Sequence, residues 1–302
     1  MAYPDALSAS SLTDPVRRAI AQRVVRIFND PEKGESPVVR RPDGLYGPES
    51  VAWRVHGDVT SMMVGGVSGL LLQMLHPAVL AGVWDHSNFR ADMHGRLRRT
   101  ARFIALTTYG GREEAEGVIG RVRRIHDQVT GVLPSGESYA ANDPALLAWV
   151  HVTEAWSFLN AWIRYAEPGM PLADQNRYFA EMAVVAERLG ADPVPRDRAS
   201  AETLIQSMRP ALRADARTRE VAQLVLGQSV GAAVTDAASA VIMQAGVDLL
   251  PHWARTMHGL KTPPVPVVRA GARTLARTLG WAYDGSPNRE VWPAEVTAWP
   301  RD

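Results

Sequence analysis

The residues best suited to hold a metal ion or a cofactor are histidines, because the chain of 302 residues contains no cysteine. The lack of cysteine excludes a thiolate nucleophile, an iron–sulfur cluster, and any zinc ion or haem with a cysteine ligand. A histidine or a carboxylate is therefore the expected ligand of any metal. The eight histidines are His56, His76, His86, His94, His126, His151, His252 and His258.

His126 lies on a helix predicted over residues 113–130. The apolar residues of this helix recur at helical spacing and form one stripe, made of Val118, Ile119, Val122, Ile125 and Val129. His126 falls within the stripe, so the helix is expected to turn its imidazole toward the core. Such a histidine either bonds to a backbone carbonyl or is the axial ligand of a haem iron.

Arg96 and Thr100 are four residues apart and share one face of a helix predicted over residues 92–109. An arginine in a partly apolar stripe is costly to bury unless it meets an anion or a strong acceptor. One interpretation is a half-buried ion pair with a carboxylate. The other is a donor to bound oxygen or to a haem propionate, with the Thr100 hydroxyl in the same pocket.

Gln73 and His76 are three residues apart in an uncharged segment and also share a helix face. They either satisfy backbone groups freed by a helix break at Pro77 or line an apolar cavity, where they orient substrate or move a proton. His151 lies with Glu154 on the stripe of a later helix. It is the alternative axial ligand, or it forms a hydrogen bond across the helical bundle.

Other chemistries find less support. Asp85-His86-Ser87 has the residue types of a hydrolase triad, but adjacent residues rarely converge and no nucleophile elbow surrounds the serine. A di-iron bundle needs a Glu-x-x-His pair on each of two helices, and the sequence contains none, so a di-metal site is a weaker alternative. The formal charge of +1 argues weakly against a nucleic-acid partner.

The elements that must position these residues are almost all helices, which predicts a single all-α domain over residues 1–302. An N-terminal helix should follow Thr13-Asp14-Pro15, residues 31–48 should form a loop, and residues 37–40 are the best candidate strand. Asn142-Asp143-Pro144 is a strong helix start. The other helices are expected at 49–76 with a break near Gly65-Gly66, and at 77–84, 92–109, 113–130, 144–167, 172–189, 199–207, 215–228, 232–258 and 264–280. The tail after residue 281 should wrap the surface.

One segment is long enough to span a bilayer, because residues 59–84 contain no Asp, Glu, Lys or Arg. It also contains Gln73, His76, Pro77 and several glycines, so a buried helix pair broken near His76-Pro77 is favoured over a stable membrane span. The N-terminus has no apolar stretch after a basic start. We therefore expect no signal peptide and a cytoplasmic location.

The order of short motifs along residues 46–259 resembles the family that shares the rubber oxygenase catalytic domain, which includes latex clearing proteins and oxygenases of the mpaB type. Each motif is weak alone, and their order and spacing together carry the resemblance. The motifs are Trp53-Arg54-Val55, Gln73-x-x-His76-Pro77, Asp85-His86-Ser87, Arg96-x-x-x-Thr100, Ile125-His126-x-x-Val129-x-Gly131, Asp143-Pro144-x-Leu146-x-x-Trp149-Val150-His151 and Leu249-Leu250-Pro251-x-Trp253.

The resemblance implies a globin-like helical domain with a buried haem b pocket, and oxidative cleavage of a carbon–carbon double bond by O₂. His126 matches the position of the haem ligand, and Arg96 with Thr100 matches a pair on the distal side. The chain departs from the rubber-cleaving enzymes in lacking an export signal and in having no glutamate at residues 76–90, shortly before Arg96, where their distal glutamate lies. Rubber is therefore not the expected substrate, and His76 is the candidate proton carrier.

The sequence thus predicts an intracellular haem b oxygenase that acts with O₂ on a small apolar substrate. His126 is the first candidate for the iron ligand and His151 the second, and Gln73 is a further candidate for contact with the haem. Residues 70–80 should contribute to the substrate cavity. Arg96 and Thr100 would stabilise negative charge on bound oxygen. The alternatives are a haem sensor or carrier, a peroxidase-like protein, and a helical protein without haem. A homodimer is one possible assembly.

Overall fold

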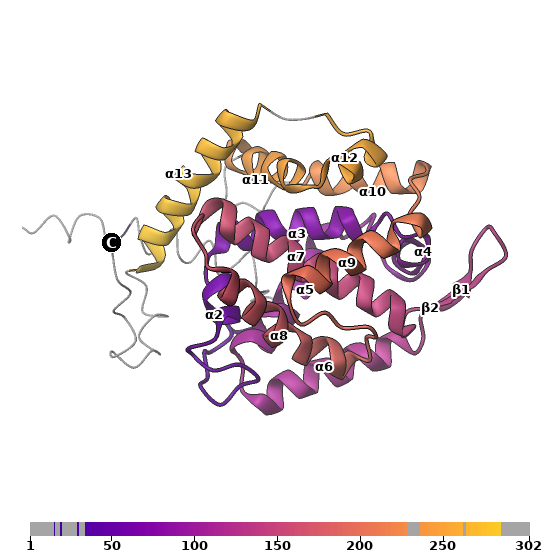
Figure 1. Ribbon diagram of the computed structural model, residues 1–302, viewed down its shortest axis with the longest axis horizontal. Coiled ribbons are helices and arrows are strands. Elements are labelled where there is room, and N and C mark those ends of the chain that lie inside the picture. Colours follow the sequence, from indigo (N-terminus) through magenta and orange to yellow (C-terminus); the bar gives the residue numbers. More distant parts are fainter. Residues whose placement is uncertain are drawn as a thin grey trace, which may run out of the picture.

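A computed structural model describes residues 34–228, 236–261 and 264–284, together with positions 15, 19 and 29. The described residues are mostly helical, which confirms the all-α class (Figure 1). The one sheet among them is a two-stranded antiparallel hairpin. The predicted N-terminal helix and the tail beyond residue 284 lie outside the described residues, apart from isolated positions.

The helices follow the predicted order along the chain. They are α2 (Val51–His56), α3 (Val59–Gln73), α4 (Pro77–His86), α5 (Met93–Tyr109), α6 (Arg112–His126), α7 (Pro144–Tyr165), α8 (Leu172–Leu189), α9 (Arg198–Met208), η2 (Arg209–Ala211), α10 (Ala216–Leu226), α11 (Asp236–Leu249), α12 (His252–His258) and α13 (Val265–Asp284). The strands are β1 (Thr130–Val132) and β2 (Ser138–Ala140), with Thr130 opposite Ala140.

Two helix starts near the candidate residues are set by aspartate side chains that cap them. The Asp143 carboxylate accepts hydrogen bonds from the backbone N–H groups of Ala145 and Leu146, at 2.9 and 3.1 Å, and Pro144 takes the first helical position as predicted. Asp92 caps α5 in the same way through the N–H of Gly95. These caps fix the ends of the two helices that carry Arg96 and His151.

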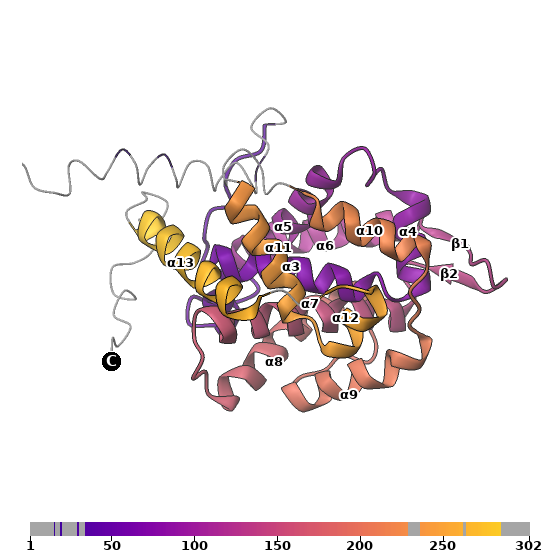
Figure 2. The same ribbon diagram turned by 90° about the horizontal axis from the view of Figure 1, so that it is seen from above.

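Helices α3 and α7 pack against each other at the centre of the fold (Figures 1 and 2). A Cβ atom added to Gly65 would lie 2.7 Å from Cδ1 of Phe158 and 2.9 Å from its Cα, so glycine is required for this approach. The predicted break at Gly65-Gly66 is therefore wrong, and α3 runs through both glycines. Tertiary packing outweighs the low helix propensity of glycine here.

The predicted break near His76-Pro77 is confirmed, because α3 ends at Gln73 and α4 begins at Pro77. The two helices are bent by 104° to each other. Within the described ranges, no single helix is long and apolar enough to cross a membrane, and only this bent pair passes that test when its helices are taken together. Much of the segment is core, since Leu71, Leu72 and Leu75 are fully buried.

Three other expectations are wrong. Residues 37–40 are not a strand, and the helix expected over 113–130 ends at His126, after which residues 130–140 form the hairpin around Gly136, whose φ is +88°. The helix expected over 232–258 is divided into α11 and α12 at Leu250-Pro251. Proline disrupts the interior of a helix because it has no N–H to donate and its ring clashes with the carbonyl group of the preceding turn.

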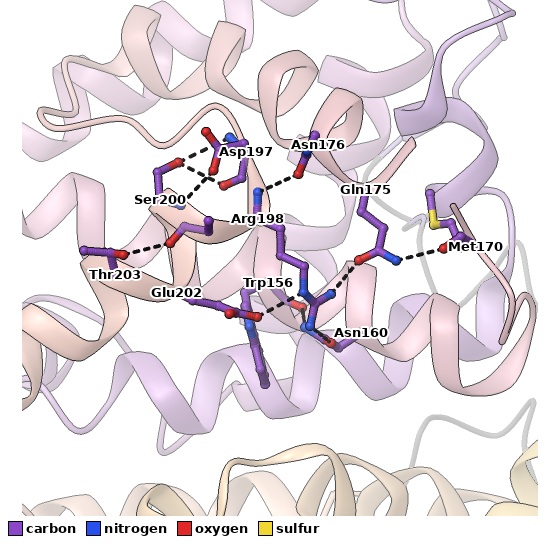
Figure 3. A network of polar contacts seen from close by, with 11 residues as sticks. Trp156, Asn160, Met170, Gln175, Asn176, Asp197, Arg198, Ser200, Glu202 and Thr203 are labelled. Atoms are coloured by element: carbon purple, nitrogen blue, oxygen red, sulfur yellow. Dashed lines mark hydrogen bonds and ion pairs between the residues drawn. The ribbon is translucent and has the colours of Figure 1, made fainter. Parts of the chain in front are cut away.

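The remaining helices form layers on the two sides of the α3–α7 pair. Helix α11 packs on α3 and α13 packs on α11, while α6 and α8 contact each other beyond α7 (Figure 1). Arg198 of α9 links α7 to α8, because its guanidinium donates to Asn160 at 3.1 Å and to Gln175 at 2.9 Å (Figure 3). Its Nε atom donates to Glu202 at 3.0 Å. Every nitrogen of this guanidinium is satisfied, which marks Arg198 as a structural clamp.

Candidate functional site

His126 on α6 lies near enough to Arg96 on the neighbouring helix α5 for the arginine's charge to act on its ring. Burial is the main cause that lowers the pKa of His126, and the positive charge of Arg96 lowers it further. The side chains of Asn142 and Asp127 act in the opposite direction. Because the net effect favours the neutral ring, His126 is suited to bind a metal, which requires an unprotonated imidazole nitrogen.

The imidazole of His126 points inward from α6, as the apolar stripe predicted. Ile119 of this stripe is buried and Val122 and Val129 are half-buried, but Ile125 is 52% exposed. The expectation that Ile125 belongs to the buried face is wrong because it lies at the margin of the helix stripe. The Nδ1 atom of His126 is buried and has no hydrogen-bond partner in the part of the chain that the structure describes. The Nε2 atom of His126 also has no partner among the described residues, but unlike Nδ1 it is not fully buried.

Arg96 has no carboxylate partner among the described residues. Its neighbours in sequence do pair, for example Arg99 with Asp92 at 3.2 Å, whereas the Arg96 side chain makes no hydrogen bond or ion pair with the described part of the chain. Burial lowers its pKa, and the charge of Arg99 adds to this effect. The half-buried ion pair considered from the sequence is therefore not formed there. The guanidinium remains available to an anion or an oxygen acceptor.

Thr100 lies one turn after Arg96 and is exposed, and its hydroxyl donates to the Arg96 carbonyl at 3.2 Å. Thr107 lies on the same helix face and is buried, with its hydroxyl bonded to the carbonyls of Phe103 and Ile104. The described protein thus covers this face of α5 near Thr107 but not near Thr100. Thr100 and Arg96 are brought together as predicted, at the less covered end.

His151 and Glu154 lie one turn apart on α7, and neither side chain forms a hydrogen bond with the described residues. The Nε2 atom of His151 is buried without a partner in the described ranges, and burial lowers the pKa of its ring to about 4. The Glu154 carboxylate makes no hydrogen bond or ion pair with the described residues, and burial raises its pKa to about 7. A carboxyl group with such a pKa exchanges its proton near neutral pH.

His56 shows what a satisfied buried histidine looks like in this fold. Its Nδ1 bonds to the Thr108 hydroxyl at 2.8 Å and its Nε2 bonds to the Tyr178 hydroxyl at 2.9 Å. Its ring also packs edge-on against Phe158, with 5.4 Å between the ring centroids. Burial lowers its pKa to about 3. His56 is therefore a structural link, in contrast to His126 and His151.

Gln73 and His76 are used at the helix break. The Gln73 amide donates to the Val150 carbonyl at 3.2 Å, and the Trp149 indole donates to the Gln73 carbonyl at 3.3 Å. The Nδ1 atom of His76 accepts the Ala78 N–H at 3.3 Å and caps α4. These are the contacts expected from the structural interpretation of the pair, and they leave Nε2 of His76 as the atom free for chemistry.

The remaining candidates make separate structural contacts. His86 bonds to the Thr130 carbonyl, the Ser87 hydroxyl donates to the Val83 carbonyl, and Asp85 accepts from the Tyr139 hydroxyl, so the three adjacent residues do not form a triad. Within the described part of the chain, no group of three or more His, Asp or Glu side chains is placed to hold a metal ion.

The sequence assigns no chemical role to Asn142, and it links Glu154 only to His151. Asn142 is recognisable only as part of a helix start, yet its side chain lies beside His126. Glu154 stands out only through its i, i+3 spacing from His151, and nothing local shows that it lacks a partner. Unpaired burial is a property of the assembled helices, so no local sequence signal reports it.

Comparison with known proteins gives one match. Neither the curated proteins nor the solved structures contain a match to this chain. The family model described as ER-bound oxygenase mpaB/B′/Rubber oxygenase, catalytic domain, matches residues 53–281, which span α2 to α13 and contain all the site residues above. The resemblance drawn from the motifs is thereby confirmed: the chain belongs to the mpaB and rubber oxygenase catalytic-domain family.

Proposed function

We propose that this protein is a haem b-dependent oxygenase that uses O₂ to oxidise a small apolar substrate. The observation that carries the proposal is the proximity of His126 on α6 to Arg96 on α5. An imidazole that burial keeps neutral, with no hydrogen bond formed to its buried Nδ1 among the described residues, lies near a guanidinium that has no counter-ion among those residues. Membership of an oxygenase family supplies the reaction type.

The residues present fit a haem group. An imidazole nitrogen is a common axial ligand of haem iron, and an arginine is suited to a propionate or to bound oxygen. His126 would hold the iron, and Arg96 with Thr100 would lie near the reacting oxygen. The bound haem would supply the iron that activates O₂. His151 is the alternative ligand, because its Nε2 is also buried without a partner among the described residues and burial keeps the ring neutral.

Arg96 would stabilise negative charge that develops on oxygen during the reaction. Its burial strengthens such an interaction, since charges attract more strongly where water is excluded. The Thr100 hydroxyl bonds to its own helix and can also donate to a neighbouring acceptor when it rotates. Replacement of Arg96 should therefore affect the chemical step more than the folding of the chain.

Glu154 is a better candidate than His76 for holding a proton. The pKa of Glu154 is raised to about 7 by burial, whereas Nδ1 of His76 is occupied by the cap of α4. A group whose pKa lies near the working pH is effective both as an acid and as a base. We propose Glu154 for the proton-handling role of the distal glutamate, since residues 76–90 contain no glutamate. Nε2 of His76 is the second candidate for this role.

The proposal is tested by incubating the haem-loaded protein and a reductant with ¹⁸O₂ and a panel of small alkenes, followed by mass spectrometry of the products. Incorporation of ¹⁸O supports an oxygenase, and two labelled atoms from one cleaved double bond support the cleavage reaction. Haem binding with no oxygen uptake beyond autoxidation indicates a sensor or carrier. Turnover with hydrogen peroxide but not with O₂ indicates a peroxidase.

A further inference from the structure

Asn142 and His126 carry two unpartnered atoms of complementary chemistry. The Nδ1 atom of His126 and the Oδ1 atom of Asn142 are both buried and have no hydrogen-bond partner among the described residues. Buried polar atoms without partners are rare in folded proteins, so each calls for an explanation. An imidazole Nδ1 that carries a proton is a donor, and an amide oxygen is an acceptor.

The two side chains already lie close together. The Asn142 side chain is close enough to the His126 ring to raise the pKa of that ring, although no hydrogen bond is formed between them. The amide nitrogen of Asn142 donates to the Asp127 carboxylate and, at 3.2 Å, to the Arg123 carbonyl. Because both acceptors belong to the end of α6, they tie the amide to the turn that carries His126 and fix which of its ends is the oxygen.

We infer that Asn142 is a positioning residue that accepts the Nδ1–H of His126 and thereby directs Nε2 toward the haem iron. The inference rests on the proposed function. Protonation of Nδ1 leaves the lone pair on Nε2, which is the ring nitrogen that is not enclosed. A hydrogen bond to the second nitrogen of a metal-bound histidine fixes its tautomer and ring orientation and makes it a stronger ligand.

Asp127 is the next residue in this hydrogen-bond network. Its carboxylate accepts a hydrogen bond from the amide nitrogen of Asn142, whose oxygen would accept from His126. A neutral amide polarises the ring less than a carboxylate would. Exchanging the two side chains should therefore strengthen the bond to Nδ1 while keeping an amide–carboxylate contact between positions 127 and 142. Removing the Asn142 side chain should weaken the hydrogen bond to Nδ1. Because the two changes alter the strength of this bond in opposite directions, they distinguish a positioning role from a general loss of structure.

The experiment compares three haem-loaded variants with the wild type: Asn142→Leu, the exchange Asn142→Asp with Asp127→Asn, and the control Asn160→Leu. Asn160 is an asparagine of α7 with comparable contacts, to the Trp156 carbonyl and to Arg198, and it is 18 positions from Asn142. The readouts are the iron–histidine stretching frequency of the ferrous protein, the reduction potential, and the rate of haem loss to excess apomyoglobin.

We expect Asn142→Leu to lower the stretching frequency, raise the potential and accelerate haem loss by about tenfold or more. The exchange should raise the frequency and lower the potential, and Asn160→Leu should change neither. Unchanged frequency and potential in both position-142 variants would overturn the inference while the proposed function stands. If Asn142→Leu does not fold, the exchange variant alone decides. A wild type that binds no haem would overturn the proposed function itself.

Discussion

Replacing Glu154 by glutamine should stabilise the protein above neutral pH, and the gain should vanish in acid. Burial raises the pKa of Glu154 from its ordinary value of 4.5 to about 7 in the folded chain. The folded state therefore holds this proton more tightly than the unfolded state does. Stability from this group is complete below about pH 4.5 and is lost as the pH rises through about 7.

The size of the effect follows from the shift. A difference of about 2.5 pKa units corresponds to about 3 kcal/mol that the wild type loses once Glu154 is ionised in both states. Glutamine has a similar shape and no charge, so Glu154→Gln avoids this loss. Between about pH 5.5 and about pH 8, the difference in unfolding free energy between variant and wild type should grow by about 2 kcal/mol.

Urea denaturation of the full chain at the two pH values measures this difference directly. The matched control is Glu113→Gln, because Glu113 is an exposed carboxylate of α6 and its replacement should leave the pH dependence unaltered. A variant-minus-wild-type difference that stays constant within about 0.5 kcal/mol between the two pH values would show that Glu154 is not a desolvated carboxyl group.

Three further substitutions test other parts of the structure. Gly65→Ala should destabilise the chain by about 1–3 kcal/mol, since the new Cβ would lie 2.7 Å from Phe158. The control Gly117→Ala on α6 should not destabilise it, because no atom lies within 4 Å of that position. A thermal or urea scan compares the two variants. Arg96→Leu should abolish oxygen uptake without loss of unfolding free energy; destabilisation with activity retained would mean that Arg96 is structural. Asp248→Asn should lower the unfolding free energy by about 2 kcal/mol, as measured in a urea scan. The Asp248 carboxylate is 3% exposed and forms ion pairs with Arg269 of α13 and Arg164 of α7, both of which are partly screened by solvent. An unchanged unfolding midpoint would refute this ionic link.

Much of the fold was predictable because its boundaries depend on local chemistry. Asp143 and Pro144 start α7 as predicted, and Pro77 separates α3 from α4. The Gly65-Gly66 pair was misread because a glycine that breaks a helix and a glycine that admits a neighbouring helix look alike in sequence. Only the position of Phe158 on α7 distinguishes the two.

The site was predictable in part for the same reason. Helical spacing alone turns His126 inward and stacks Arg96 with Thr100, and the structure agrees on both points. Whether a polar group has a partner depends on helices that are distant in sequence. His56 is satisfied by side chains of α5 and α8, and Glu154 on α7 meets no such partner among the described residues. Spacing along one helix cannot separate these two cases.

The most direct test of the proposed haem site is the absorption spectrum of the protein purified after expression with ample haem. Wild type should show a Soret band, His126→Ala should lose it, and His151→Ala, the matched control on α7, should keep it. A colourless wild type would contradict haem binding altogether. A Soret band of unchanged position and intensity in His126→Ala would contradict the assignment of His126 as the iron ligand.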